Sequence, residues 1–167
     1  NAVVFDVDFQ QSNIATNELN YFYNEFGADQ YIELKGTLKG PLNDFRLSRV
    51  ELKNQATYIS GDFRFENLLK GDDSYVITAE NHSIQSNYYD LRRFMPGLLG
   101  QVMPKEMESL RDFDLSGNTT ISGTTLETDS SIKSALGNLK TNLRMTSINN
   151  VNRATYKGTI DINQFNL

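Results

Sequence analysis

Few side chains in this sequence could do acid–base, nucleophilic or metal chemistry. His82 is the single histidine, and the 167 residues include no cysteine. Neither a histidine-based metal site, nor a Ser-His-Asp triad, nor thiol chemistry can be assembled from such a set. The polar segment around His82, "ENHSIQS", favours an ordinary surface residue over a catalyst.

Carboxylate pairs are the remaining candidates for acid–base catalysis or cation binding. They are Asp6/Asp8, Asp72/Asp73 and Glu106/Glu108. Asp6 and Asp8 alternate with apolar residues, which is typical of the solvated face of a strand. Asp72 and Asp73 follow a glycine and indicate a turn. Because no calcium loop, phosphate-binding loop or nucleophile motif occurs, we expect no enzyme activity, no cofactor and no metal site.

Composition restricts the partners further. The net charge is −5, which disfavours nucleic acid and anionic membrane surfaces as electrostatic partners. No run reaches the roughly 18 apolar residues of a membrane-spanning helix. Hydrophobic residues make up 38% of the chain, a share that suits thin sheets with one solvated face. Since the chain starts without methionine and stops inside a strand-like pattern, we expect a segment of a longer protein.

Most of the sequence alternates between apolar and polar residues with the period of two that β-strands have. In "FRLSRVELK" the parity changes between Leu47 and Val50, which predicts a β-bulge at Ser48-Arg49. The sequence therefore predicts a mainly β protein of many antiparallel strands. The clearest alternating stretches are 3–10, 31–40, 45–53, 57–65, 113–123, 138–145 and 156–162.

Two short stretches have helical spacing instead. Residues 17–26 place apolar side chains at i, i+3, i+4 and i+7, and residues 89–99 repeat that spacing. Pro96 must end or kink the second helix. A further helical turn is expected in "KEMESL", residues 105–110.

The two helical stretches belong to an internal repeat. Val4-Phe5 and Glu18-Leu19 match Val76-Ile77 and Asp90-Leu91 at a constant separation of 72 residues. We expect one repetitive segment, with a first unit at about 1–72, a second at about 73–153 and the start of a third at 154–167. Such an array is typical of solenoid-like or long-sheet architectures.

Glycines recur on the apolar side of the expected strands, as in "YIELKGTLKG". They are Gly36, Gly40, Gly61, Gly117, Gly123 and Gly158. One explanation is that they permit strong twist, bulges or coiling of a curved sheet. The other is that they lower the floor of a concave apolar surface and leave room for a ligand. The two explanations can hold together.

Five pieces of the chain succeed one another in a recognisable order. They are "LKGTLKGPLNDFRLSRVELKNQATYISGDFRF", "DLRRFMP", "DLSGNTTISG", "SIKSALGNLKTNLRM" and "YKGTIDINQFNL". In this order they resemble the TamB family of the AsmA-like group, specifically its long members in Bacteroidota. Each motif alone is degenerate, and the resemblance rests on their ordered succession over nearly the whole chain.

The resemblance implies a β-taco, an elongated, twisted antiparallel sheet folded lengthwise into a U-shaped groove, with two short inserted helical segments. It implies a periplasmic bridge that carries phospholipid acyl chains between the inner and outer membranes. A linked role in outer-membrane protein assembly, an Omp85-type barrel partner (TamA or a related protein) and an inner-membrane anchor elsewhere in the full-length chain are also implied. The inserted helices would plug or line the groove, or else merely cap a sheet edge.

The groove of the family is a property of strand parity, so residues transfer to this chain only as strand positions. Those expected to face the lipid are Leu34, Leu38, Phe45, Leu47, Ile59, Phe63, Phe65, Ile77, Phe113, Leu115, Ile121, Ile160 and Ile162. The alternative is a ligand-free repetitive β-sandwich or stalk module of a cell-envelope protein, in which these side chains form a sealed core. A conduit leaves an open apolar trough, and a stalk does not.

Overall fold

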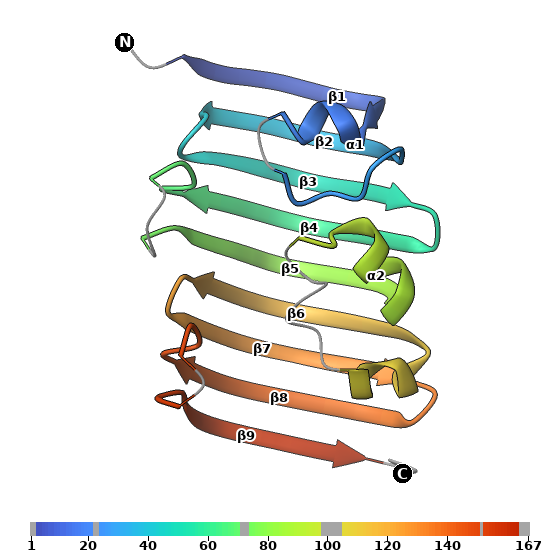
Figure 1. Ribbon diagram of the computed structural model, residues 1–167, viewed down its shortest axis with the longest axis vertical. Helices are drawn as coiled ribbons and strands as arrows, with labels where there is room; N and C mark the ends of the chain where they lie inside the picture. The colour runs from blue at the N-terminus through green and yellow to red at the C-terminus, as the bar shows by residue number, and fades with distance from the viewer. Residues whose placement is uncertain (1–2, 22–23, 71–73, 98–104, 151, 164–167) are drawn as a thin grey trace.

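One open antiparallel sheet contains every described strand (Figure 1). The computed structural model describes residues 3–21, 24–70, 74–97, 105–150 and 152–163. Nine strands follow one another in chain order, and the first does not pair with the last. They are β1 Val4–Ala15, β2 Tyr31–Pro41, β3 Phe45–Asn54, β4 Thr57–Glu66, β5 Val76–Asn87, β6 Asp112–Ser122, β7 Thr125–Ser134, β8 Gly137–Thr146 and β9 Thr155–Asn163. The predicted mainly β class is confirmed.

Short turns of two or three residues form four of the eight connections between neighbouring strands. Gln55-Ala56 connects β3 to β4, and Ala135-Leu136 connects β7 to β8. Gln55 has a φ of 50°, the positive value that tight two-residue hairpin turns require. Since every strand pairs antiparallel with the next, such tight turns suffice to build the sheet.

Within the described ranges, three helical segments interrupt the strand order. They are α1 Thr16–Leu19, α2 Tyr88–Phe94 and η1 Lys105–Leu110, the last a 3₁₀ helix. The predicted helix at 89–99 is confirmed for α2, which ends two residues before Pro96. Its first turn is capped by Asn87, whose side-chain oxygen accepts a hydrogen bond from the Asp90 amide at 2.9 Å.

The predicted helix at 17–26 is wrong beyond its first turn. Helix α1 ends at Leu19, and the Asn20 side chain accepts from the Phe26 amide at 3.1 Å and donates to the Phe26 carbonyl at 2.9 Å. An asparagine that bonds nearby backbone in this way competes with helical hydrogen bonds. Phe22 and Tyr23 of the predicted stripe lie outside the described residues.

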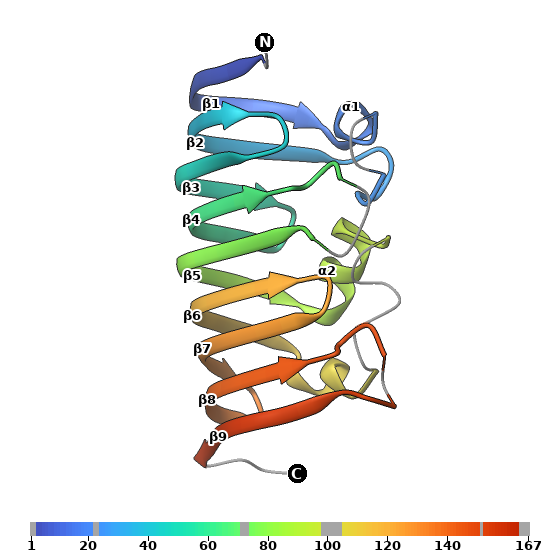
Figure 2. The ribbon, with the colours of Figure 1, turned by 90° about the vertical axis from the view of Figure 1, so that its left-hand side faces the viewer.

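The helical segments lie on the same side of the sheet (Figure 2). Both long connections follow strands that run in the same direction, β1 and β5, so they leave the sheet at the same end. The order of one strand, a helical connection and three strands occurs twice, and β9 follows. The division into repeat units at 72 and 153 stays a prediction.

Irregular pairing is concentrated in the middle of the strands. The register shifts between Leu47 and Val50 in β3, and the intervening Arg49 has a φ of 53°. The predicted bulge at Ser48-Arg49 is therefore confirmed. A second bulge of the same kind lies in β5, where Asn81 has a φ of 49°. The Arg49 amide donates to Asp62 and the Asn81 amide to Asn118, so each bulge has its free N–H satisfied.

Candidate functional site: one apolar sheet face

All thirteen residues predicted to face a lipid lie on one face of the sheet. Residues that pair directly across neighbouring strands share a face, as do alternate residues along a strand. The register joins Leu34, Leu52 and Ile59 in one row across β2 to β4, and that row continues through Ile84 and Leu115. We call this side of the sheet the apolar face.

Further residues of the apolar face were not among the predicted positions. The register adds Val7, Phe9, Ile32, Val50, Leu52, Ile84, Leu126, Ile132, Leu139, Leu143, Met145 and Tyr156. Many of them lie in alternating stretches, so strand parity was the signal that could have found them. Leu126 and Ile132 belong to β7, a strand that the sequence pattern did not mark.

The apolar face is not sealed by a second layer over the described part of the chain. Of the thirteen predicted residues, Phe113 is buried at 6% exposure, Ile160 and Ile162 on the edge strand β9 are 58% and 57% exposed, and the other ten are half-buried. In a sealed sandwich core such side chains would be fully buried. Phe45 and Phe65 stack with ring centroids 4.6 Å apart. Side chains of the apolar face therefore pack against their neighbours in the sheet, and their outer ends stay accessible.

The opposite face, which we call the outer face, is polar and charged. Ion pairs cross between its strands, with N–O distances of 3.1 Å for Lys39–Asp6 and 3.2 Å for Arg46–Glu80. The side chains of both pairs are more than half exposed, so these pairs contribute little stability and mark a solvated surface. Asp6 of the predicted carboxylate pair is thus an ordinary surface ion-pair partner. Asp72 and Asp73 lie outside the described residues.

The helical segments cover the apolar face at one end of the strands. At that end Ile32, Thr57 and Phe113 are almost fully buried, although neighbouring residues toward the middle of the strands are only half-buried. Phe94 of α2 is 2% exposed, and its carbonyl accepts from the Gly27 amide at 2.9 Å. We call the segment that joins β1 to β2 and the segment that joins β5 to β6 the two insertions. They contact each other through Gly27 and Phe94 and form a cover over one strand end, while the rest of the face stays open.

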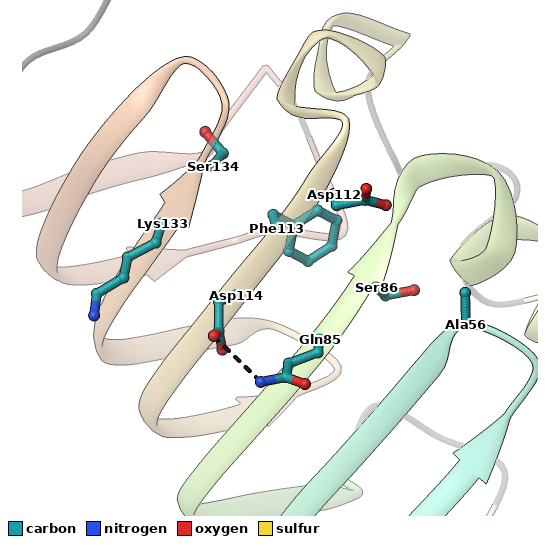
Figure 3. Close-up of a pocket in the computed structure, with 8 residues that line it drawn as sticks. All are labelled: Ala56, Gln85, Ser86, Asp112, Phe113, Asp114, Lys133 and Ser134. Carbon is teal, nitrogen blue, oxygen red and sulfur yellow. Dashed lines mark hydrogen bonds between the residues drawn. The ribbon is translucent and has the colours of Figure 1, made fainter.

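A recess of about 420 Å³ lies at this covered end, across β5 to β7 (Figure 3). Phe113, Ser86 and Ser134 line it, with Gln85 donating to Asp114 at 3.3 Å beside them. It is shallow and contains no nucleophile–base pair. Among the described residues no group of three or more His, Cys, Asp or Glu side chains could hold a metal ion.

A line across the middle of the sheet, which we call the central row, runs through Gly36, Val50, Gly61, His82, Gly117, Ser130 and Thr141. As far as Ser130, glycines alternate with buried residues along this row, and Thr141 at its end is half-buried. Gly117 has a φ of 151°, and a Cβ there would lie 2.1 Å from the Asp129 carbonyl oxygen. The backbone therefore requires a glycine at this position. This agrees with the first of the two explanations for the recurring glycines, that they permit twist and bulges.

His82 is buried at 3% exposure, so the expectation of a plain surface residue is wrong. The bulge at Asn81 turns His82 onto the apolar face, where it pairs with Gly117. Its Nε2 lies 2.9 Å from the Thr119 hydroxyl, and its Nδ1 is buried without a partner. Burial lowers the pKa of His82 below the usual 6.5, because it disfavours the charged imidazole.

Hydroxyl groups extend from His82 across the next strands. Thr119 Oγ1 lies 3.0 Å from Thr128 Oγ1, which lies 2.5 Å from Ser130 Oγ. All four side chains are on the apolar face, and sequence reasoning assigned a role to none of them. We call His82, Thr119, Thr128 and Ser130 the polar cluster.

Comparisons with protein-family models, with curated proteins and with solved structures find no match to this chain. In the described ranges of the chain, no helix is long and apolar enough to cross a bilayer.

Proposed function

We propose that this chain is a segment of a lipid-conducting bridge protein, whose apolar face holds the acyl chains of phospholipid during their passage between membranes. The observation that supports the proposal most strongly is the half-exposure of ten predicted lipid-facing side chains on one continuous face. An accessible apolar surface of this extent is uncommon on proteins without a hydrophobic partner. Acyl chains are a fitting partner, because each CH₂ removed from water contributes about 0.8 kcal/mol.

A groove suits this function better than a flat face. Along the central row, bulges in β3 and β5 lie opposite glycines in β2 and β4, and such combinations are how sheets acquire sharp curvature. We infer that the sheet folds lengthwise about this row into a U-shaped groove, with the apolar face inside and the charged outer face in water. The covering insertions then lie at one rim.

The resemblance to the TamB family supports the remaining parts of the proposal. It implies a periplasmic protein that is anchored to the inner membrane through another part of the full-length chain. It also implies an Omp85-type barrel such as TamA as the partner at the outer membrane, and a linked role in outer-membrane protein assembly. The ligand-free stalk is the competing function. The half-exposed face argues against the sealed core that a stalk needs.

Charged substitutions on the apolar face test the proposal. Leu38→Lys and Phe63→Lys should each abolish transfer of a fluorescent phospholipid between donor and acceptor vesicles, because a lysine ammonium on the route is costly to bring against acyl chains. Circular dichroism should show unchanged β content. Ser60→Lys is the matched control, since it adds the same charge to the outer face of β4, opposite Glu51. Transfer that survives both apolar-face substitutions would contradict the proposed route.

A further inference from the structure

The polar cluster interrupts an otherwise apolar surface. Thr119 and Thr128 pair directly across β6 and β7 in the row that contains Phe63 and Ala79 on one side and Leu143 on the other. Acyl chains gain nothing from hydroxyl groups at such positions, where valine would fit a strand as well. The apolar function of the face therefore does not explain why these residues are polar.

The polar cluster has one more hydrogen-bond donor hydrogen than its internal contacts use. Neutral His82 has one N–H, and the three hydroxyls have one O–H each, which makes four hydrogens. The three contacts within the cluster use three of them. Wherever the spare hydrogen is placed, one donor in the cluster has no acceptor among the described side chains.

Two unpartnered buried polar atoms lie in the same region. His82 Nδ1 and Thr141 Oγ1 have no hydrogen-bond partner, and Thr141 pairs directly with Ser130. Both atoms are fully buried, so a bound molecule cannot contact them directly and can accept the spare hydrogen only at Thr119 or Thr128. Thr119 and Thr128 are half-buried, so a molecule on the apolar face can reach them.

We propose that the polar cluster is a subsite for an uncharged oxygen acceptor of the bound lipid, namely an ester carbonyl that joins an acyl chain to glycerol. This inference rests on the proposed function. The cluster contains no cationic side chain, so it suits a neutral carbonyl better than a phosphate, which is usually bound by arginine, lysine or backbone amides. The subsite fixes where along the strands the junction between acyl chain and headgroup lies.

Matched lipids test the subsite. The purified chain is titrated with pyrene-labelled diacyl phosphatidylcholine and with the dialkyl ether analogue of the same chain length, which lacks the carbonyls. We expect the wild type to bind the diacyl lipid on the order of 5–10-fold more tightly, the effect of one buried hydrogen bond. In T119V/T128V that preference should disappear, so that the two lipids bind with equal affinity. Thr120→Val on the outer face of β6 is the control and should keep the preference.

The outcomes separate this inference from the proposed function. Equal binding of the two lipids by the wild type, or a preference that survives in both T119V/T128V and Ser130→Ala, overturns the subsite and leaves acyl-chain binding intact. Failure of the wild type to bind either lipid overturns both. Circular dichroism of each variant shows whether the sheet is retained, and Ser130→Ala removes a hydroxyl without adding volume if the double variant does not fold.

Discussion

Residues on the apolar face have two roles: most are positioned to contact a ligand, and a few fix the backbone of the sheet. Most are apolar and half-exposed, which suits contact with a fluid and variable ligand. A few along the central row are buried against glycines, and these fix the backbone. His82 belongs to the second group, because it lies between Gly61 and Gly117 and is nearly inaccessible to water.

The single histidine predicts an acid-sensitive fold. Because burial lowers the pKa of His82 in the folded state, the unfolded chain binds a proton on His82 at a pH where the folded chain does not. The free energy of unfolding should therefore fall as the pH is lowered from 7.5 through about 6.5 toward 5, and be independent of His82 above that range. Urea unfolding at a series of pH values measures it. His82→Gln should flatten the profile, and an equal slope in both proteins would contradict the assignment.

The conformation of Gly117 predicts that even a small side chain at this position lowers the free energy of unfolding. Gly117→Ala should lower the free energy of unfolding by about 1–3 kcal/mol, because its φ of 151° is a strained conformation for any side chain and the new Cβ would meet the Asp129 carbonyl. Ser116→Ala, on the exposed outer face of the same strand, should change stability by less than about 0.5 kcal/mol. Equal effects of the two substitutions would show that the backbone tolerates a side chain there.

At the scale of elements, the two insertions act as a cover for one strand end. The Gln30 side chain donates to the Arg93 carbonyl at 2.8 Å, and the rings of Phe26 and Phe94 lie 5.6 Å apart. The first insertion is thus joined to the second over the strands between them. This arrangement protects one end of the apolar face from water.

Truncation of Phe94 tests the cover. Phe94→Ala should lower the free energy of unfolding by about 3–5 kcal/mol, as for a fully buried aromatic ring. Tyr21→Ala, at a position that is 83% exposed, is the control and should have little effect. A loss below about 1 kcal/mol for Phe94→Ala would mean that the insertions do not pack on the sheet.

Sequence reasoning predicted most strands but missed β7. Strand parity is a local property, so the side that each predicted residue faces could be worked out from its neighbours in sequence. In β7 the positions on the apolar face include Thr128 and Ser130, which blur the alternation between Leu126 and Ile132. The burial of His82 could not be predicted either, because it depends on glycines in two neighbouring strands and on a bulge next to it.

At the scale of the whole molecule, the described part of the sheet ends in two edge strands, β1 and β9. Every described residue of β9 is exposed, and Ile160 and Ile162 lie on its apolar face. An edge strand, whose outer hydrogen-bonding groups are unpaired, is a template for pairing with another strand. The isolated chain is therefore expected to self-associate through its edges.

A charged side chain on the apolar face of the edge strand β9 should disperse such assemblies. Ile160→Lys should shift the chain toward the monomer at a given concentration, because a charge on the apolar face of an edge strand opposes pairing with another strand. Analytical ultracentrifugation measures the shift. Ile59→Lys places the same charge inside the sheet and leaves both edges unchanged. If Ile59→Lys disperses the assemblies and Ile160→Lys does not, association occurs through the apolar face instead of the edge.

If the apolar face is an open lipid-binding surface, the purified chain should retain lipid. Lipid mass spectrometry of the chain, prepared under mild conditions beside a sealed β-sandwich of similar size, measures this. The expected result is phospholipid retained in a reproducible molar ratio by this chain and not by the control. A lipid-free, monomeric chain would exclude an open lipid-binding face, and a sealed structural module would then explain the sequence better.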